Sequence, residues 1–151
     1  MKVLFICTGN TCRSCMAEQT FNKLSTLDNT TAISAGLSVV KGSKTSKHSA
    51  ILIKENYNID ISEREAVQLT SDILAESDLV LTMTSYMKDV LLTNSPHMRS
   101  KIYSLNDYVG IKGHIADPFG GDSTIYTKTF NELKNSILLL IAKLKEDKSI
   151  Q

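Results

Sequence analysis

The sequence predicts a single α/β domain in which a small parallel sheet is flanked by helices. Short runs of almost entirely apolar residues alternate with segments whose apolar residues recur at helical spacing. The 151 residues are enough to bury one core. Of these residues, 42% are hydrophobic and 22% are charged, which is ordinary for a folded globular protein and unlike a disordered chain.

The first expected strand covers residues 2–6, which are β-rich and almost wholly apolar, as in a strand buried inside a parallel sheet. A helix should follow from Cys15 to about Thr26, with Ser14 as its cap. Its core face is formed by residues at helical spacing, namely Met16, Ala17, Thr20, Phe21 and Leu24.

The next segment repeats this order of strand, loop and helix. Residues 32–34 should form a second short strand, and the polar stretch 36–45, which contains two glycines, should form a loop. A helix is expected over 46–57, where Asn58 is a typical stop. Its partly inward residues should be Ala50, Ile51, Leu52 and Ile53.

A third strand is expected at 78–83, a continuous apolar run that follows the start of a short helix at Thr70. A capping residue at 84 or 85 should begin a helix that runs to about Thr93, because Ser95-Pro96 would end it. A shorter fourth strand should cover 101–103.

The last part of the chain should contain a long loop and a long helix. The stretch 106–122 is rich in glycine and is expected to be a loop. Asp122-Ser123 should cap a helix that runs to about Asp147 and packs one apolar stripe against the sheet. The stripe consists of Phe130, Leu133, Ile137, Leu140, Ile141 and Leu144.

The loop after the first strand holds the most informative stretch of the chain, Cys7-Thr8-Gly9-Asn10-Thr11-Cys12-Arg13-Ser14. A tight loop between a strand and a helix lets backbone N–H groups converge on an anion, and Gly9 and Asn10 tolerate the left-handed angles that turn them inward. Cys7 would be held there as a thiolate, and the planar fork of Arg13 suits phosphate oxygens. The motif therefore predicts covalent phosphoryl chemistry, the alternative being a buried cysteine beside an arginine that caps a turn.

Two further groups would complete this chemistry. The Ser14 hydroxyl can donate to the Cys7 sulfur and stabilise it as a leaving group. The group that leaves phosphorus needs a proton donor, and Asp117 is the candidate, on the long loop where catalytic residues are common. Pro118 stiffens the backbone beside it, and Phe119 could line one wall of the pocket. The alternative to a catalytic role is that Asp117 and Pro118 only form an ordinary turn.

The composition argues against several other classes of protein. The net charge is only +1, whereas binding to nucleic acids or membrane surfaces usually needs a large basic excess. No apolar run approaches the roughly 20 residues that span a bilayer, and the N-terminal apolar stretch is too short for a signal peptide. We therefore expect a cytoplasmic protein without nucleic-acid or membrane partners.

The cysteines and histidines argue against disulfide frameworks and metal sites. All three cysteines lie between positions 7 and 15, and an odd, clustered set does not form a framework. Zinc needs four suitably spaced ligands, whereas His48, His97 and His114 are scattered and are expected at the surface or at helix ends. We expect no metal and no cofactor.

Together these motifs resemble those of the low-molecular-weight protein tyrosine phosphatases. The matching stretches, spread over nearly the whole chain, are Cys7 to Ser14, Ser34-Ala35-Gly36, Asp78 to Met83 and Asp117-Pro118. The resemblance implies one three-layer domain over 1–151, a four-stranded parallel sheet and phosphorylated proteins as substrates. We expect a monomer, although the sequence itself does not reveal whether the chain self-associates. In that family the roles of Cys7, Arg13 and Asp117 would be nucleophile, phosphate ligand and general acid. The remaining binding residues would be Thr8, Gly9, Asn10, Thr11, Cys12, Ser14 and Phe119.

Two features resemble the bacterial protein arginine phosphatases more closely. The tyrosine phosphatases usually carry an aliphatic residue at the position of Thr11 and often two aromatic residues after the Asp-Pro pair, whereas Gly120 and Gly121 follow Phe119 here. A phosphoguanidinium is planar and positively charged beyond its phosphate, so Thr11 could contact it and Asp117 could pair with it. Phosphoarginine is the expected substrate and phosphotyrosine the alternative, in which case Thr11 is a neutral substitution.

The other two cysteines receive different interpretations. Cys15 stands where the family usually has a proline that starts the helix, and we expect a small buried side chain there. Cys12 either packs beneath the loop or forms a reversible disulfide with Cys7, as a resembling pair can in the family, which would protect Cys7 from irreversible oxidation.

Two other functions are less favoured. Arsenate reductases of this fold need further cysteines downstream on a mobile segment, and no cysteine follows Cys15. A phosphate-binding redox sensor without turnover would need no general acid such as Asp117.

Overall fold

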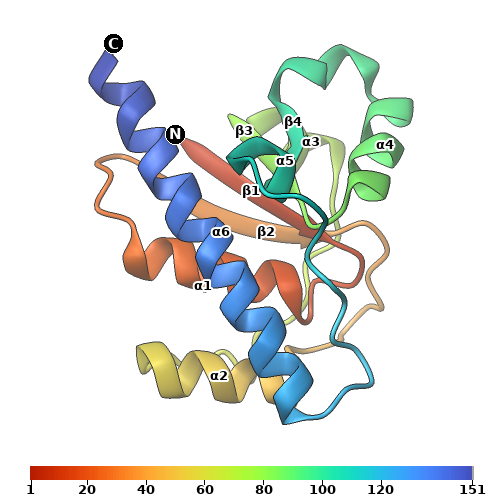
Figure 1. Ribbon diagram of the computed structural model, residues 1–151. Helices are drawn as coiled ribbons and strands as arrows, with labels where there is room; N and C mark the ends of the chain where they lie inside the picture. The colour runs from red at the N-terminus through yellow and green to blue at the C-terminus, as the bar shows by residue number, and fades with distance from the viewer. Residues whose placement is uncertain (151) are drawn as a thin grey trace.

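The computed structural model, which describes residues 1–150, has a four-stranded sheet at its centre (Figure 1). The strands are β1 (Lys2–Cys7), β2 (Thr31–Gly36), β3 (Leu79–Thr82) and β4 (Ile102–Ser104). Their order is β2-β1-β3-β4, and each neighbouring pair is parallel. The predicted parallel sheet is confirmed. Residue 151, the end of the predicted domain, lies outside the described residues.

The central strand β1 is buried on both faces. Val3, Phe5 and Cys7 belong to the larger apolar cluster on one face of the sheet, and Leu4 and Ile6 belong to the smaller cluster on the other. Successive side chains of a strand point to opposite faces, so a strand covered on both sides is apolar throughout. This explains why β1 is a continuous apolar run.

Helices cover both faces of the sheet and confirm the three-layer arrangement. The larger cluster is completed by α1 (Arg13–Leu24), α2 (Lys47–Tyr57) and α6 (Ser123–Ile150), and the smaller one by α3 (Ser71–Glu76) and α4 (Ser85–Asn94). Figure 1 shows α6, in blue, crossing the front of the sheet beside α1. The predicted stripe of α6 is buried along its whole length, from Phe130 to Leu144. No helix within residues 1–150 combines the length and apolarity needed to cross a membrane.

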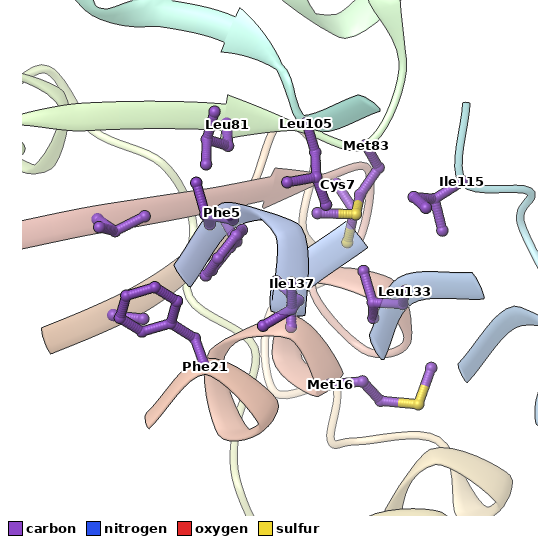
Figure 2. Close-up of a cluster of buried hydrophobic side chains, with 14 of the residues drawn as sticks. Phe5, Cys7, Met16, Phe21, Leu81, Met83, Leu105, Ile115, Leu133 and Ile137 are labelled. Atoms are coloured by element: carbon purple, nitrogen blue, oxygen red, sulfur yellow. The ribbon is translucent and has the colours of Figure 1, made fainter. Parts of the chain in front are cut away.

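The larger apolar cluster extends to Cys7, the first residue of the phosphate motif, by which we mean Cys7 to Ser14. Figure 2 shows Cys7 in the same cluster as Met83, Leu105 and Ile115, with Phe5 earlier on β1. Cys7 is only 3% exposed. The floor beneath this side chain is therefore packed apolar core, which fixes its position.

Several local expectations are confirmed and others are wrong. The hydroxyl of Thr84 and the carboxylate of Asp122 accept hydrogen bonds from Met87 and Ile125 N–H, as helix caps do, and Asn58 ends α2 with a left-handed φ of 56°. Ile51, expected to point partly inward, is instead 41% exposed, because α2 packs through its buried residues Ser49, Ala50, Ile53 and Tyr57.

Two element boundaries also differ from the prediction. Ser14 does not cap α1, which begins at Arg13 with Cys12 in the capping position. The stretch 106–122 is not all loop, because α5 (Leu105–Val109) follows β4 directly and extends into it. The 3₁₀ helix η1 (Pro96–Lys101) precedes β4. A helix of five residues is too short to show an apolar period. It is held by packing against α6, including the 2.7 Å bond that Ser136 Oγ donates to Asn106 Oδ1.

Candidate active site

The phosphate motif lies at the carboxyl edge of the sheet. β2 and β3 lie on opposite sides of β1, and this kind of switch point is where open α/β sheets bind ligands. A pocket of about 380 Å³ lies there. The predicted site residues that line it are Cys7, Thr8, Gly9, Thr11, Cys12, Arg13, Asp117 and Phe119. The loop after β2 adds three that were not predicted: Ser38, Val40 and Ser43.

The sulfur of Cys7 faces polar partners on the loop. Its Sγ accepts a hydrogen bond from Asn10 N–H at 3.2 Å and lies 2.8 Å from Ser14 Oγ. Ser14 lies inside the first turn of α1, and its hydroxyl is turned toward the sulfur. Such donors stabilise negative charge on sulfur, both in a thiolate and in a departing leaving group.

Asn10 lies behind the loop and holds its shape. Its φ of 57° is left-handed, as predicted, and its side chain is fully buried. The amide Nδ2 donates to Ser14 Oγ at 2.7 Å and to Ser34 Oγ at 3.0 Å. Its Oδ1 accepts from Val67 N–H at 2.9 Å and from Arg64 Nη1 at 3.0 Å. Four hydrogen bonds thus fix the residue that aims an N–H at the sulfur.

The network behind Asn10 includes residues that were not predicted to take part. Arg64 Nη2 donates to Ser34 Oγ at 3.0 Å and lies 3.5 Å from Glu18 Oε1, and Ser34 Oγ donates to the same Glu18 oxygen at 2.9 Å. Glu18 lies one helical turn after Ser14, so helical spacing could have indicated it. Arg64 carries no such signal, because it comes from the segment after α2.

Gly36 rather than Gly9 is the glycine that the loop geometry requires. A Cβ at Gly36 would lie 2.7 Å from the carbonyl oxygen of Thr8, so only glycine lets the end of β2 approach the loop. The expectation of a left-handed Gly9 is wrong, since its φ lies outside that region and a Cβ there would make ordinary contacts. Gly9 lines the pocket without being required by the backbone.

Arg13 joins the phosphate loop to the segment that carries Asp117. Arg13 is 4% exposed, and its Nη1 donates to the carbonyl oxygen of Ile115 at 3.0 Å. Its Nη2 lies 3.7 Å from Asp117 Oδ2. Ile115 N–H in turn donates to the Met83 carbonyl at the end of β3. These contacts bring the carboxylate of Asp117 to the edge of the pocket. The Asp117 side chain is 54% exposed.

The residues after Asp117 form a tight turn. Gly121 N–H donates to the Pro118 carbonyl at 2.8 Å, and Gly120 has a left-handed φ of 82°. A Cβ at Gly121 would lie 2.9 Å from the Pro118 carbonyl oxygen and 2.8 Å from the Ile125 side chain. Both glycines are therefore explained by the backbone of the turn, independently of any substrate.

Cys12 packs beneath the loop in this structure, and its thiol is free. Its Sγ lies 3.4 Å from Tyr126 Oη and donates to Ser46 Oγ at 3.5 Å. The pKa of Tyr126 is raised to about 12, mainly by burial and secondly by the contact with Cys12. The Tyr126 hydroxyl therefore stays protonated at neutral pH and remains a partner for the sulfur.

Cys15 is expected to be unreactive in the native protein. It is fully buried and its Sγ donates to the Cys12 carbonyl at 3.1 Å, and burial raises the pKa of this thiol far above its ordinary value. Treatment with iodoacetamide at about pH 8 should modify Cys7 at least about 100-fold faster than Cys15, since the thiolate is the reacting form. Mass spectrometry of peptides with and without denaturant measures this, and equal labelling of both thiols in the folded protein would contradict it.

The low molecular weight phosphotyrosine protein phosphatase family matches residues 2–150. The chain is 34% identical to a protein-arginine-phosphatase of Bacillus subtilis (strain 168) over 151 residues, which cover 98% of this chain and 99% of the relative. It is 39% identical to the low molecular weight protein-tyrosine-phosphatase PtpB of Staphylococcus haemolyticus (strain JCSC1435) over 145 residues, or 96% and 98% of the two chains.

A solved structure is similar along its whole length. It is a YwlE arginine phosphatase, a cysteine-to-serine mutant with a phosphorylated active-site serine, with a TM-score of 0.91, 33% identity and 100% coverage of both chains. The structural similarity confirms the fold, and the family match covers nearly the whole chain. The chain therefore belongs to the low molecular weight phosphotyrosine protein phosphatase family, whose members are cysteine-dependent phosphatases.

Proposed function

We propose that this chain removes phosphate from phosphoarginine residues of proteins through a cysteinyl-phosphate intermediate. The observation that carries the arginine assignment is the hydroxyl-bearing side chain of Thr11 in the wall of the pocket that Cys7 and Asp117 also line. The similarity to the protein-arginine-phosphatase of Bacillus subtilis supports the assignment.

In the first step the Cys7 sulfur attacks phosphorus and the bond from phosphorus to the guanidinium nitrogen breaks. The loop N–H groups and the guanidinium of Arg13 bind the three equatorial oxygens. Asp117 donates a proton to the departing nitrogen, so arginine leaves in its ordinary protonated form. Ser14 and Asn10 N–H stay within hydrogen-bond distance of the sulfur.

In the second step water attacks phosphorus and the bond from sulfur to phosphorus breaks. Asp117, now ionised, takes the proton from the water, and inorganic phosphate leaves the loop. The sulfur departs as a thiolate, which the contacts from Asn10 N–H and Ser14 stabilise. The phosphorylated serine in the YwlE mutant supports covalent transfer at this position of the loop.

Thr11 distinguishes the two candidate substrates by its hydrogen-bonding capacity. A guanidinium has N–H donors beyond the phosphate, and the Thr11 hydroxyl can accept from one of them or orient the attacking water. Asp117 lines the same pocket and is the acid that protonates the departing guanidinium nitrogen. Because Gly120 and Gly121 are explained by their turn, Thr11 carries the assignment without them.

Phosphotyrosine is the second candidate, favoured by a different observation. Phe119 and Val40, which line the same pocket, are 82% and 75% exposed. Two exposed apolar side chains at the pocket offer packing area to an aromatic ring. The similarity to PtpB of Staphylococcus haemolyticus supports this candidate.

Phosphate release from a phosphoarginine protein and a phosphotyrosine peptide, measured side by side, tests the proposal. The reduced protein should favour phosphoarginine by more than about tenfold in kcat/KM. In Thr11→Val, which keeps the shape and removes the hydroxyl, this kcat/KM should fall by about tenfold, the value of one hydrogen bond, while that for phosphotyrosine stays within about twofold.

Thr45→Val is the matched control. The Thr45 hydroxyl is buried without a hydrogen-bond partner and lies outside the residues that line the pocket, so this variant should keep the ratio of the two kcat/KM values. A wild-type preference for phosphotyrosine would reject the arginine assignment, while leaving the role of Cys7 untouched. An equal loss on both substrates in Thr11→Val would show that Thr11 does not discriminate between them.

A further inference from the structure

A second hollow shares one wall with the active-site pocket. It has a volume of about 530 Å³ and lies beyond the end of β3, at the start of α4. Arg13 and Asp117 line both cavities. The other side chains that bear on its chemistry are Ser85, Tyr86, Asp107 and His114.

The shared wall places the hollow next to the reacting phosphate. Arg13 and Asp117, which the proposed mechanism uses at phosphorus, separate the two cavities. A polypeptide advances about 3.3–3.6 Å per residue when extended. Residues close in sequence to a phosphorylated side chain bound in the first pocket can therefore reach the second.

The accessible charge of the hollow is negative. Asp107 is exposed, and its carboxylate oxygen Oδ2 accepts a hydrogen bond from Ser85 Oγ at 3.5 Å. Asp117 is about half exposed. Arg13 is the lining residue with a permanent positive charge in the described part of the chain, and it is 4% exposed and already bonded to Ile115. A ligand in the hollow therefore meets the carboxylate of Asp107 before it meets a cation.

Tyr86 adds an aromatic face to these carboxylates. Its side chain is 76% exposed, although it is large and hydrophobic, and it lies in the first turn of α4. An aromatic ring beside a carboxylate suits a lysine or arginine side chain, because the ring attracts the cation and also packs against its methylene groups.

We propose that this hollow binds a positively charged side chain of the substrate protein, a few residues from the phosphorylated position. The inference rests on the proposed function, since it needs a phosphorylated protein in the first pocket. Such binding would let the enzyme recognise the residues around the phosphorylated side chain in addition to the phosphate itself. Asp107 and Tyr86 would be specificity residues, with no part in the bond-making steps.

Two series of synthetic peptides test the inference, one with a central phosphoarginine and one with a central phosphotyrosine in an alanine background. Lysine or glutamate is placed in turn at each of the three positions on either side. Lysine at one or two positions should raise kcat/KM about three- to tenfold over alanine, the range for a partly exposed ion pair with an aromatic contact, and glutamate there should lower it.

Variants of Asp107 and Tyr86 connect this preference to the hollow. Asp107→Lys should reverse the preference at the same positions, and Tyr86→Ala should reduce the lysine gain. Asp89→Lys is the matched control, because it makes the same change of charge at an exposed site of α4 that does not line the hollow. Hydrolysis of a small aryl phosphate, which reaches only the first pocket, should be unchanged in all three variants.

The possible outcomes distinguish failure of this inference from failure of the proposed function. No lysine gain at any position in either series, or a gain that survives in Asp107→Lys, would overturn the inference. A gain that appears only in the phosphotyrosine series supports the hollow and rejects the arginine assignment. Hydrolysis of the small aryl phosphate without hydrolysis of any peptide would reject a protein substrate and, with it, the hollow as a peptide site.

Discussion

Cys7→Ser is expected to lower kcat by at least about 10⁴-fold, the scale of losses when an enzyme nucleophile is removed. A serine hydroxyl is far less ionised than a thiol, and an alkoxide is a poorer leaving group in the second step. Inorganic phosphate should still bind, with a Kd within about tenfold of the wild-type value, because Arg13 and the loop N–H groups are unchanged. Steady-state phosphate release and calorimetric titration with phosphate measure the two effects.

The control for this prediction is Cys15→Ala. Cys15 is a buried thiol of the same segment, does not line the pocket and should leave kcat within a few-fold of the wild-type value. A Cys7→Ser protein with kcat within tenfold of the wild type would reject Cys7 as the nucleophile. Loss of phosphate binding together with turnover would instead show that the loop no longer keeps its shape.

Arg13→Lys is expected to lower kcat/KM by about 10³-fold, although the positive charge is kept, because arginine clamps on phosphoryl groups contribute about 10³–10⁵. Lysine lacks the planar fork that holds two phosphate oxygens. The variant would also lose the arrangement in which one guanidinium donates a hydrogen bond to the Ile115 carbonyl and faces Asp117. We therefore expect kcat to fall as well as phosphate affinity, because the general acid is no longer held beside the loop.

Arg99→Lys is the control for Arg13→Lys. Arg99 is exposed on η1 and lines neither the active-site pocket nor the second hollow, so its exchange should leave kcat/KM unchanged. An Arg13→Lys protein within tenfold of the wild type would show that charge alone suffices at this position. A fall in affinity without a fall in kcat would reject the coupling between Arg13 and the segment that carries Asp117.

Most of the fold could be predicted from the sequence, because its signals are local. β1 is a continuous apolar run because both of its faces are covered, and α6 shows a regular stripe because one face is covered. The short α5 escaped prediction for the opposite reason. Its five residues are ordered by contacts with α6 and not by a pattern of their own.

The candidate site likewise has one part that local sequence could predict and another part that it could not. The residues from Cys7 to Ser14 are consecutive, so one short stretch of sequence is enough to predict the chemistry of the loop. The apolar residues Val40 and Phe119 at the pocket were harder to assign together, because nothing in the sequence relates the loop after β2 to the loop before α6.

The sequence by itself determined the parallel α/β fold and was enough to propose a phosphate-binding loop with Asp117 as the acid, since each follows from residue types in short, contiguous stretches. Only the tertiary structure decided that Arg13 binds the segment of Asp117, that Arg64 and Ser34 hold Asn10, and that a second hollow adjoins the pocket. The physical reason is that a parallel sheet gathers the loops after its strands at one edge, whatever their separation along the chain.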